Sequence, residues 1–376
     1  MRVLVTTTGS AGHLGPLLPF AHAIRDQGGE VLIAARDDFA GAVTSAGFDV
    51  WPFPQGDPEA RRAIFASLGD DLGSIEANRR VVSELFAGIY TEAALPRVVE
   101  ACATFRPDVI LSETAEFAGG LAAEHAGIPH VRVGICAPSF EAQFGEGIDE
   151  AVAQHRAGLG LPDAAGPEAP YLTLAPPALD DHGAVPDARR FRAEEPAPAP
   201  LPDWWHGAGE PLVYLTLGSV AGSMGFFPGV YRAAIDALAP LGVRVLVTTG
   251  RDADPAELGP LPANVHAERW VPQADVMPHA SVMVCHGGFG TVRAGLAAGI
   301  PLAVLPLFAD QPYNAARVEA LGAGIALDGP DGIADAVRTL LSEPSYAARA
   351  LDVAAETREL PPVADAVLAI REYAGA

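Results

Sequence analysis

A strand–helix rhythm that runs through the chain twice is the feature that most constrains its fold. In the first half, short β-branched runs alternate with alanine-rich amphipathic segments. We predict strands at about 2–8, 30–35, 108–112 and 130–135, and helices at about 16–27, 39–46 and 116–126. Such alternation is typical of a parallel sheet with helices on both faces. The predicted fold class is therefore α/β, doubly wound.

The rhythm breaks at a proline-rich tract, residues 194–202, and then restarts. Since proline is excluded from central strands and helix interiors, we expect a semi-rigid extended linker there. Strands are predicted again at about 211–217, 244–249, 282–285 and 302–306. The 376 residues also exceed one typical core. We predict an N-terminal Rossmann-like domain at 1–195, a linker at 196–210 and a C-terminal Rossmann-like domain at 211–376, whose last helix, 363–373, could pack back on the first domain.

Two segments of the first half, 56–104 and 137–160, depart from the rhythm. The first is predicted to form long helices, and the second is predicted to be irregular. Aromatic residues at helical spacing belong more often to a core than to a ligand site, but insertions in a regular sheet domain are where a pocket is built. The candidate pocket residues are Phe65, Phe86, Tyr90, Phe140 and Phe144.

The sequence contains no lysine, since all 24 Lys and Arg residues are arginine. This excludes a P-loop nucleotide hydrolase in its usual form, Schiff-base chemistry and a standard protein kinase, each of which depends on a lysine. A formal net charge of −23 argues against a nucleic-acid partner. No apolar run reaches the roughly 18 residues of a membrane span, and the N-terminus does not resemble a signal peptide. We expect a cytoplasmic protein without membrane insertion.

A glycine-rich turn follows a predicted strand in each half. The first, 8–16, contains Gly12 and His13, and the second, 285–291, contains His286. Glycine lets the backbone approach a ligand, and the N-terminus of the following helix attracts anions. Such turns often merely pack a helix against a strand, but a histidine in both is less expected, because histidine is a good proton acceptor near neutral pH. We assign Gly12 to an anion-binding turn.

Four motifs of the second half occur in a specific order. They are YLTLGS at 214–219, RWVPQ at 269–273, HGGFGT at 286–291 and DQPYNA at 310–315. With them the sequence resembles the natural-product branch of the nucleotide-sugar-dependent glycosyltransferases, similar to the actinomycete enzymes for enediynes, macrolides and polyketides. The resemblance spans nearly the whole chain. It implies the GT-B fold, in which two Rossmann-like domains face each other across a cleft.

The resemblance implies a nucleobase and sugar site in the second domain. Trp270 would flank the nucleobase, with Val271 and Gln273 close by, since an aromatic face suits a planar heterocycle. Asp310 and Gln311 would bond the sugar hydroxyls, although an aspartate before a helix is also a common cap.

The resemblance also implies a diphosphate site at a helix N-terminus. His286, Gly288, Gly290 and Thr291 would hold the diphosphate there through N–H groups and one imidazole, in place of the missing lysine. The hydroxyl of Ser219 would donate to the same diphosphate.

His13 is the residue that we expect to act as the catalytic base. In such enzymes an acceptor hydroxyl attacks the anomeric carbon in line while the nucleoside diphosphate departs, which inverts the stereochemistry. A neutral imidazole takes the proton and needs an orienting acceptor on its other nitrogen. The family supplies a carboxylate at the end of the fourth strand, and here Glu113 takes that place, whereas Asp108 lies earlier on the strand. For Glu113 an ordinary helix-start carboxylate is the alternative.

One departure from the family bears on the donor. Many members that use uridine donors place a glutamate three positions after the threonine, where it bonds the ribose, but this chain has Ala294. A thymidine diphosphate sugar lacks the 2′-hydroxyl and would therefore lose less binding than a uridine donor when this carboxylate is absent. We therefore favour a thymidine donor, with a uridine donor still open.

No pattern of cysteine or histidine residues resembles a metal site, and we expect neither a metal nor another cofactor. The expected partners are a nucleotide-sugar donor and a hydrophobic small-molecule acceptor, contacted by the aromatic residues of the first domain. The protein itself is expected to be a monomer or a homodimer. Three alternatives stay open: C-glycosylation of an aromatic acceptor, a nucleotide-sugar epimerase or hydrolase on the same fold, and a non-catalytic partner protein.

Overall fold

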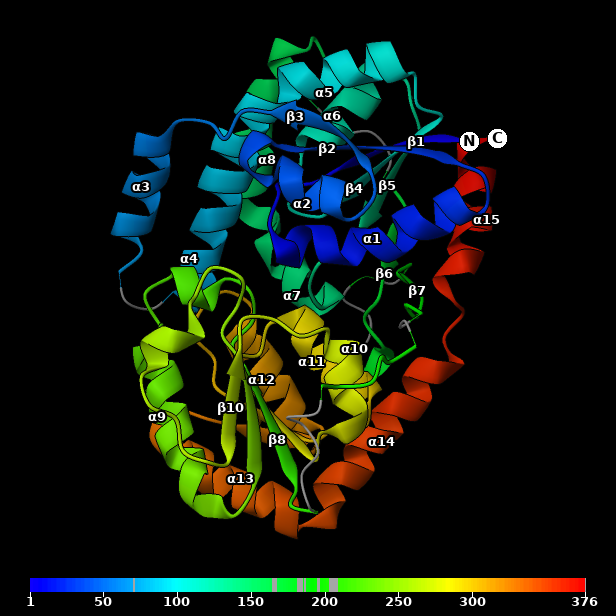
Figure 1. Cartoon of the computed structure of the whole chain (residues 1–376). Coiled ribbons are helices and arrows are strands. Elements are labelled where there is room, and N and C mark those ends of the chain that lie inside the picture. The colour runs from blue at the N-terminus through cyan, green and yellow to red at the C-terminus, as the bar shows by residue number, and fades with distance from the viewer. Residues whose placement is uncertain are drawn as a thin grey trace. The chain divides into compact units, whose positions relative to one another are not determined.

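The computed structural model (Figure 1) describes residues 1–69, 72–163, 168–180, 185, 187–194, 197–202 and 209–375. The chain forms two compact units. The first contains Met1–Ala175, Asp180–Glu194 and Leu360–Ala376, and the second contains Pro176–Leu179 and Glu195–Glu359. The linker predicted at 196–210 lies partly outside the described residues.

A parallel sheet of seven strands forms the centre of the first unit. Its order is β3-β2-β1-β4-β5-β6-β7. The strands are β1 (Arg2–Thr6), β2 (Glu30–Arg36), β3 (Asp49–Phe53), β4 (Val109–Glu113), β5 (His130–Val133), β6 (Tyr171–Thr173) and β7 (Arg189–Arg190). The four strands predicted in this half are confirmed, with ends that differ by one or two residues.

Helices surround this sheet. They are α1 (Ala11–Asp26), α2 (Ala40–Ser45), α3 (Pro58–Ser67), α4 (Ile75–Arg80), α5 (Thr91–Phe105), α6 (Ala118–Ala126), α7 (Pro138–Glu141), α8 (Gly145–Gly158) and α15 (Val363–Ala374). The segment 137–160, predicted to be irregular, is instead largely helical, because α7 and α8 occupy most of it.

Side chains along β4 alternate between two hydrophobic cores. Val109 and Leu111 belong to the core that α1 and α15 cover, whereas Ile110 belongs to the core that α5 and α6 cover. Because successive side chains of a strand point to opposite faces, Ser112 continues the α6 face and Glu113 continues the α1 face. The end of this strand therefore supplies one polar side chain to each side of the sheet.

Helix α1 begins five residues before its predicted start at 16. The prediction treated Pro16 as the first helical residue, but Pro16 and Pro19 lie inside the helix. A proline ring crowds the carbonyl four residues earlier, and here those residues are Gly12 and Gly15, which carry no Cβ. As a result, His13 lies in the first turn of α1.

The C-terminal helix belongs to the first unit. Val363, Val367 and Ile370 of α15 join the core beside α1, and the two helices lie side by side in Figure 1. The side-chain amide of Gln27, which follows α1, donates to the carbonyl of Ala364 at 2.8 Å. The end of the chain thus completes the α1 face of the first sheet.

The second unit repeats the same topology. Its parallel six-stranded sheet has the order β10-β9-β8-β11-β12-β13. The strands are β8 (Leu212–Thr216), β9 (Arg244–Thr248), β10 (Val265–Glu268), β11 (Val282–Cys285), β12 (Leu302–Val304) and β13 (Gly324–Ala326). The helices are α9 (Gly229–Leu238), α10 (Gln273–Val276), α11 (Phe289–Ala297), α12 (Gln311–Ala320), α13 (Ile333–Ser342) and α14 (Pro344–Glu359). These elements confirm the predicted α/β class in both halves.

Short 3₁₀ helices and one π-helix complete the secondary structure of the described residues. The 3₁₀ helices are η1 (Asp37–Phe39), η3 (Ala142–Phe144), η4 (Pro177–Leu179), η6 (Ala221–Ser223), η7 (Ala239–Leu241), η8 (Pro255–Leu258), η9 (Met277–His279) and η10 (Pro330–Gly332). The π-helix η2 (Val81–Tyr90) joins α4 to α5, and the Thr91 hydroxyl donates to the carbonyl of Phe86 at 2.8 Å. Within the described residues, no helix is long and apolar enough to span a membrane.

Candidate active site

The strand order reverses at the centre of each sheet, and ligands of such sheets bind at that point, beyond the carboxyl ends of the strands. In the first unit the reversal lies between β1 and β4, and in the second between β8 and β11. His13 follows β1 and Glu113 ends β4, so both reach the first reversal point. His286 follows β11 and Ser219 follows β8, so both reach the second.

His13 and Glu113 form a hydrogen-bonded pair. The Nδ1 atom of His13 lies 2.8 Å from Oε1 of Glu113, whose side chain is completely buried, while 17% of the His13 side chain is exposed. The backbone N–H and the hydroxyl of Thr8 donate to the same carboxylate oxygen at 3.1 and 2.9 Å. The N–H of Ala115 donates to Oε2 at 2.6 Å. Four donors therefore converge on one carboxylate.

These donors keep Glu113 ionised. Burial alone raises the pKa of its carboxyl group, but the attraction of His13 and the hydrogen bonds from His13, Thr8 and Ala115 outweigh burial and hold the pKa below its usual value. An ionised carboxylate only accepts hydrogen bonds, so Nδ1 of His13 must carry the hydrogen. The neutral ring then has its lone pair on Nε2, which is the arrangement that a proton acceptor requires.

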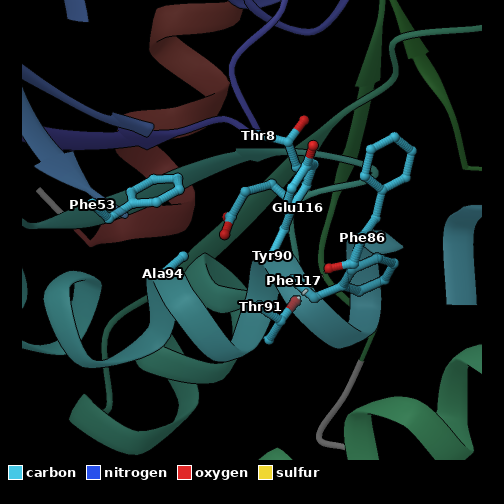
Figure 2. A pocket seen from close by; sticks show the side chains of 8 residues that line it. All are labelled: Thr8, Phe53, Phe86, Tyr90, Thr91, Ala94, Glu116 and Phe117. Atoms are coloured by element: carbon cyan, nitrogen blue, oxygen red, sulfur yellow. Dashed lines mark hydrogen bonds between the residues drawn. The ribbon is translucent and has the colours of Figure 1, made fainter. Parts of the chain in front are cut away.

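Two of the five aromatic residues predicted to line a pocket lie beside this pair. The ring of Phe86 meets the His13 ring edge-on at a centroid distance of 5.2 Å, and Phe86 contacts Tyr90 at 5.8 Å. Figure 2 shows the small pocket that these residues line. Its residues are Thr8, Phe53, Phe86, Tyr90, Thr91, Ala94, Glu116 and Phe117.

The other three aromatic residues lie elsewhere in the first unit. Phe140 and Phe144 are buried and contact each other edge-on at 4.9 Å, at the start of the α7–α8 segment. Phe65 is 46% exposed on α3. The structure therefore places Phe86 against the histidine and Tyr90 against Phe86, and it forms a separate aromatic pair from Phe140 and Phe144.

The glycine-rich turn of the second unit encloses His286. A Cβ atom added to Gly218 would approach Nε2 of His286 to 2.6 Å, and one added to Gly288 would approach it to 2.5 Å. Both contacts are shorter than a real side chain allows, so the two glycines make room for the imidazole. Gly288 caps the N-terminus of α11, and Gly290 and Thr291 lie in its first turn, where helical N–H groups lack intrahelical acceptors.

His286 is neutral at physiological pH. Burial lowers the pKa of its imidazole to about 4, and its Nδ1 atom is buried without a hydrogen-bond partner. A buried polar atom without a partner is uncommon and indicates a site where a ligand group can bind. The turn therefore offers an uncharged imidazole beside a helix N-terminus, which together suit an anion.

A second loop of this unit is fixed to the glycine-rich turn. The side-chain amide of Asn314 donates to the carbonyl of Gly287 at 2.8 Å and to the carboxylate of Asp310 at 2.7 Å. The side-chain oxygen Oε1 of Gln311 accepts from the N–H groups of Leu307 and Phe308 at 2.8 and 3.0 Å. Asp310 stands at the N-cap position of α12, but its side chain makes no capping hydrogen bond, and Gln311 is the first residue of the helix.

The remaining donor-site candidates follow other strands of the same sheet. Trp270 comes after β10 and is 52% exposed, with the guanidinium of Arg251 stacked 4.7 Å from its ring centre. Val271 is half-buried and Gln273 begins α10. Ser219 is exposed in the turn after β8. All of these positions lie beyond the carboxyl ends of strands in one parallel sheet.

The sequence analysis assigned no role to several residues that shape the two sites. Thr8 bonds Glu113 across 105 positions of the chain, and Gly218 leaves space for His286 across 68; local sequence carries no signal for such contacts. Asn314 is four residues after Asp310 on one helix face, a spacing that predicts their bond. Among the described residues, no group of three or more His, Cys, Asp or Glu side chains is arranged to hold a metal ion.

Comparisons with known proteins agree with this architecture. The models of the erythromycin biosynthesis protein CIII-like N-terminal and C-terminal domains match residues 22–218 and 232–372. The L-demethylnoviosyl transferase of Streptomyces niveus is 33% identical over 334 residues, which cover 87% of this chain and 85% of that protein. The elloramycin glycosyltransferase ElmGT of Streptomyces olivaceus is 34% identical over 386 residues, which cover 97% and 95%.

A solved structure extends the likeness to three dimensions. The glycosyltransferase SsfS6 of Streptomyces sp. SF2575, complexed with thymidine diphosphate, matches with a TM-score of 0.80 and 26% identity over 99% of each chain. The fold and these matches define a GT-B glycosyltransferase of the antibiotic-biosynthesis type. Within that class, the chain belongs to the erythromycin biosynthesis protein CIII-like family. The predicted fold class and transferase class are both confirmed.

The buried neutral state of His286 predicts a specific pH dependence of stability. The pKa of its imidazole is about 4 in the folded protein, against 6.5 for an unperturbed histidine. As pH falls below 6.5, the unfolded chain binds a proton that the folded protein refuses until about pH 4, so stability falls over this window. In His286→Gln, which cannot titrate, the loss of unfolding free energy between about pH 6.5 and about pH 4.5 should be smaller by about 1–2 kcal/mol.

The free energy of unfolding of wild type and of His286→Gln, measured by urea unfolding at several pH values in this range, tests the prediction. His130 is a second buried histidine whose pKa burial lowers to about 4, and it contributes equally to both proteins. The difference between the two curves therefore isolates His286. Parallel curves would contradict a neutral buried imidazole at this position.

Proposed function

We propose that this glycosyltransferase moves a sugar from a thymidine diphosphate donor to a hydroxyl group of a hydrophobic natural-product acceptor, with inversion at the anomeric carbon. The observation that carries the proposal is the hydrogen bond between Nδ1 of His13 and the buried carboxylate of Glu113. It leaves Nε2 as the acceptor for the hydroxyl proton of the acceptor molecule. A carboxylate behind the ring also stabilises the imidazolium that forms when the proton arrives.

The proposed reaction is a single displacement. The acceptor oxygen forms a bond to the anomeric carbon as its proton passes to Nε2 of His13. The bond from the anomeric carbon to the diphosphate oxygen breaks, and its electron pair leaves with the nucleoside diphosphate. Phe86 and Tyr90, which lie beside the histidine, supply apolar surface for the acceptor.

The leaving diphosphate is assigned to the glycine-rich turn of the second unit. The N-terminus of α11, with Gly288, Gly290 and Thr291, offers N–H groups and the positive end of the helix dipole. His286 is neutral, so it contributes a hydrogen bond rather than a charge. Helix dipole and N–H groups stabilise charge that develops on a leaving group, and we therefore propose transfer without a metal ion.

The other donor contacts follow from the loops around that turn. Trp270 exposes a ring face for the nucleobase, with Val271 and Gln273 beside it. Asp310 and Gln311 lie at the start of α12, which Asn314 ties to the turn, and they are the proposed partners of the sugar hydroxyls. Ser219 is assigned to the diphosphate. Gly12, in the first turn of α1, is assigned to an anion-binding turn of the first unit.

A direct test is a matrix of thymidine and uridine diphosphate sugars against hydrophobic aglycones, with products read by mass. We expect one or more glycosides, formed equally well in the presence of a chelator, with the acceptor-bound sugar of opposite anomeric configuration to the donor. Incubation with donor alone is the control for hydrolysis or epimerisation. Donor breakdown without any glycoside, or abolition of product by the chelator, would contradict the proposal.

The thymidine preference rests on Ala294, in the middle of α11 three residues after Thr291. A glutamate at this position can accept a hydrogen bond from a ribose 2′-hydroxyl, which thymidine donors lack. We expect wild type to prefer the thymidine donor, and Ala294→Glu to shift the kcat/KM ratio toward the uridine donor by about tenfold, the range of one added charged hydrogen bond.

Ala298→Glu is the matched control for that shift. It adds the same charge at the C-terminal end of α11, where the side chain is exposed. The control should leave the donor ratio near that of wild type. An equal shift in both variants, or none in Ala294→Glu, would show that position 294 does not contact the nucleoside.

A further inference from the structure

A chain of buried polar side chains crosses the sheet on the face opposite Glu113. The hydroxyl of Thr6 on β1 forms hydrogen bonds with the hydroxyl of Ser112 on β4, at 2.8 Å, and with the carboxylate of Glu116. Nε2 of His130 on β5 lies 3.1 Å from the Ser112 hydroxyl. Four polar groups from three neighbouring strands and the turn after β4 are thus linked, and none of them belongs to the proposed mechanism.

Glu116 is the charged member of this network. Its side chain is buried, and its two carboxylate oxygens accept from the N–H groups of Ala118 and Gly119 at 2.9 and 3.0 Å, at the start of α6. A Cβ atom added to Gly119 would lie 2.3 Å from the Ser112 hydroxyl and 2.4 Å from that of Thr6. The network therefore exists only because residue 119 has no side chain.

This second carboxyl group lies next to the proposed catalytic pair. Glu116 follows Glu113 by three residues, and the two side chains repel each other. Glu116 also lines the pocket that Thr8 and Phe86 line (Figure 2). Thr8 bonds Glu113 and Phe86 contacts His13, so Glu116 shares this pocket with one neighbour of each member of the pair.

We propose that Glu116 is a positioning residue for sugar transfer, whose negative charge behind the His13–Glu113 pair stabilises the imidazolium formed at His13. The inference rests on the proposed function, because it requires His13 to take a proton. Glu116 does not touch the reacting atoms. It acts through the electrostatic field at His13, and through the wall that it forms with Thr8 and Phe86.

The charge of Glu116 changes in the neutral range. Burial raises the pKa of its carboxyl group to about 7, and the nearby charge of Glu113 acts in the same direction against the hydrogen bonds from Thr6 and the α6 N–H groups. The other titratable groups around Glu116 each keep a single protonation state in the neutral pH range. Glu113 stays ionised because its pKa is lowered, His130 stays neutral with a pKa of about 4, and the Cys102 thiol of α5 stays protonated with a pKa of about 11.

The ratio of wild-type to Glu116→Gln kcat/KM, measured against pH, tests this role. Glutamine keeps the size and can accept the α6 hydrogen bonds, but it has no charge. We expect a ratio near 1 at about pH 6, where Glu116 is largely protonated, and about fivefold to tenfold at about pH 8.5, where its charge is present. The KM for the donor should stay unchanged, because the donor contacts are assigned to the second unit.

Glu141→Gln is the matched control. Burial raises the pKa of the Glu141 carboxyl group to about 7 as well, but Glu141 bonds the N–H groups of Ile135 and Cys136 and the hydroxyl of Tyr171, each at 2.8 Å, outside the network. The ratio of wild-type to Glu141→Gln kcat/KM should not change with pH. A pH-dependent ratio in both variants would assign the effect to buried carboxyl groups in general and overturn the proposal.

Thr6→Val provides a second variant that keeps the carboxyl group. It removes a hydrogen bond that favours the charged form, so the change in kcat/KM near neutrality should move to higher pH. A purely structural role predicts a lower rate with the same pH dependence in Glu116→Gln and Thr6→Val, and that result would overturn the proposal. The proposed function is judged separately, by whether wild type forms the glycoside at all.

Discussion

The hydrogen bond between the buried Glu113 carboxylate and Nδ1 of His13 is the interaction on which the rest of the first unit's site depends. A carboxylate that is buried away from water requires hydrogen-bond donors from the protein. His13 supplies one of them, and Thr8 and Ala115 supply the others. Because Glu113 is held ionised, it fixes the tautomer of His13 and directs the lone pair to Nε2. The parallel order of β1 and β4 is what brings residues a hundred positions apart to this contact.

The two units share a topology but provide opposite kinds of chemistry. In the first, the buried carboxylate of Glu113 orients the imidazole of His13. In the second, burial keeps His286 neutral between Gly218 and Gly288, beside a helix N-terminus. A chain without lysine and with a net charge of −23 can accommodate an anionic donor in this way, because N–H groups and a helix dipole attract phosphate without a basic surface.

Sequence alone predicted the elements that follow from local pattern. The strands were predicted from their β-branched runs, and His13 was singled out by its place in a glycine-rich turn after a strand. The role of Glu113 came from the family resemblance, which implies a carboxylate at the end of the fourth strand. The predicted start of α1 was wrong, because Pro16 was taken as the first helical residue, whereas Pro16 and Pro19 both lie inside the helix.

Apart from the His13–Glu113 pair, contacts between distant segments could not be predicted from the sequence. The bond of Thr8 to Glu113, and the network that joins Thr6, Ser112 and Glu116, depend on strand register and on which face each side chain takes. When the register of the strands is unknown, nothing distinguishes Glu116 from an ordinary acidic residue before a helix. Its burial and its link to β1 appear only when the sheet is assembled.

The most direct test of the account is the turnover of His13→Ala, Glu113→Gln and the double variant, measured with saturating donor. If the two residues act as one unit, each single substitution lowers kcat by about 100-fold to 10,000-fold, with little change in the donor KM. The double variant should then be no slower than His13→Ala. Turnover of His13→Ala within about twofold of wild type would contradict the central claim, because the proton would then have another acceptor.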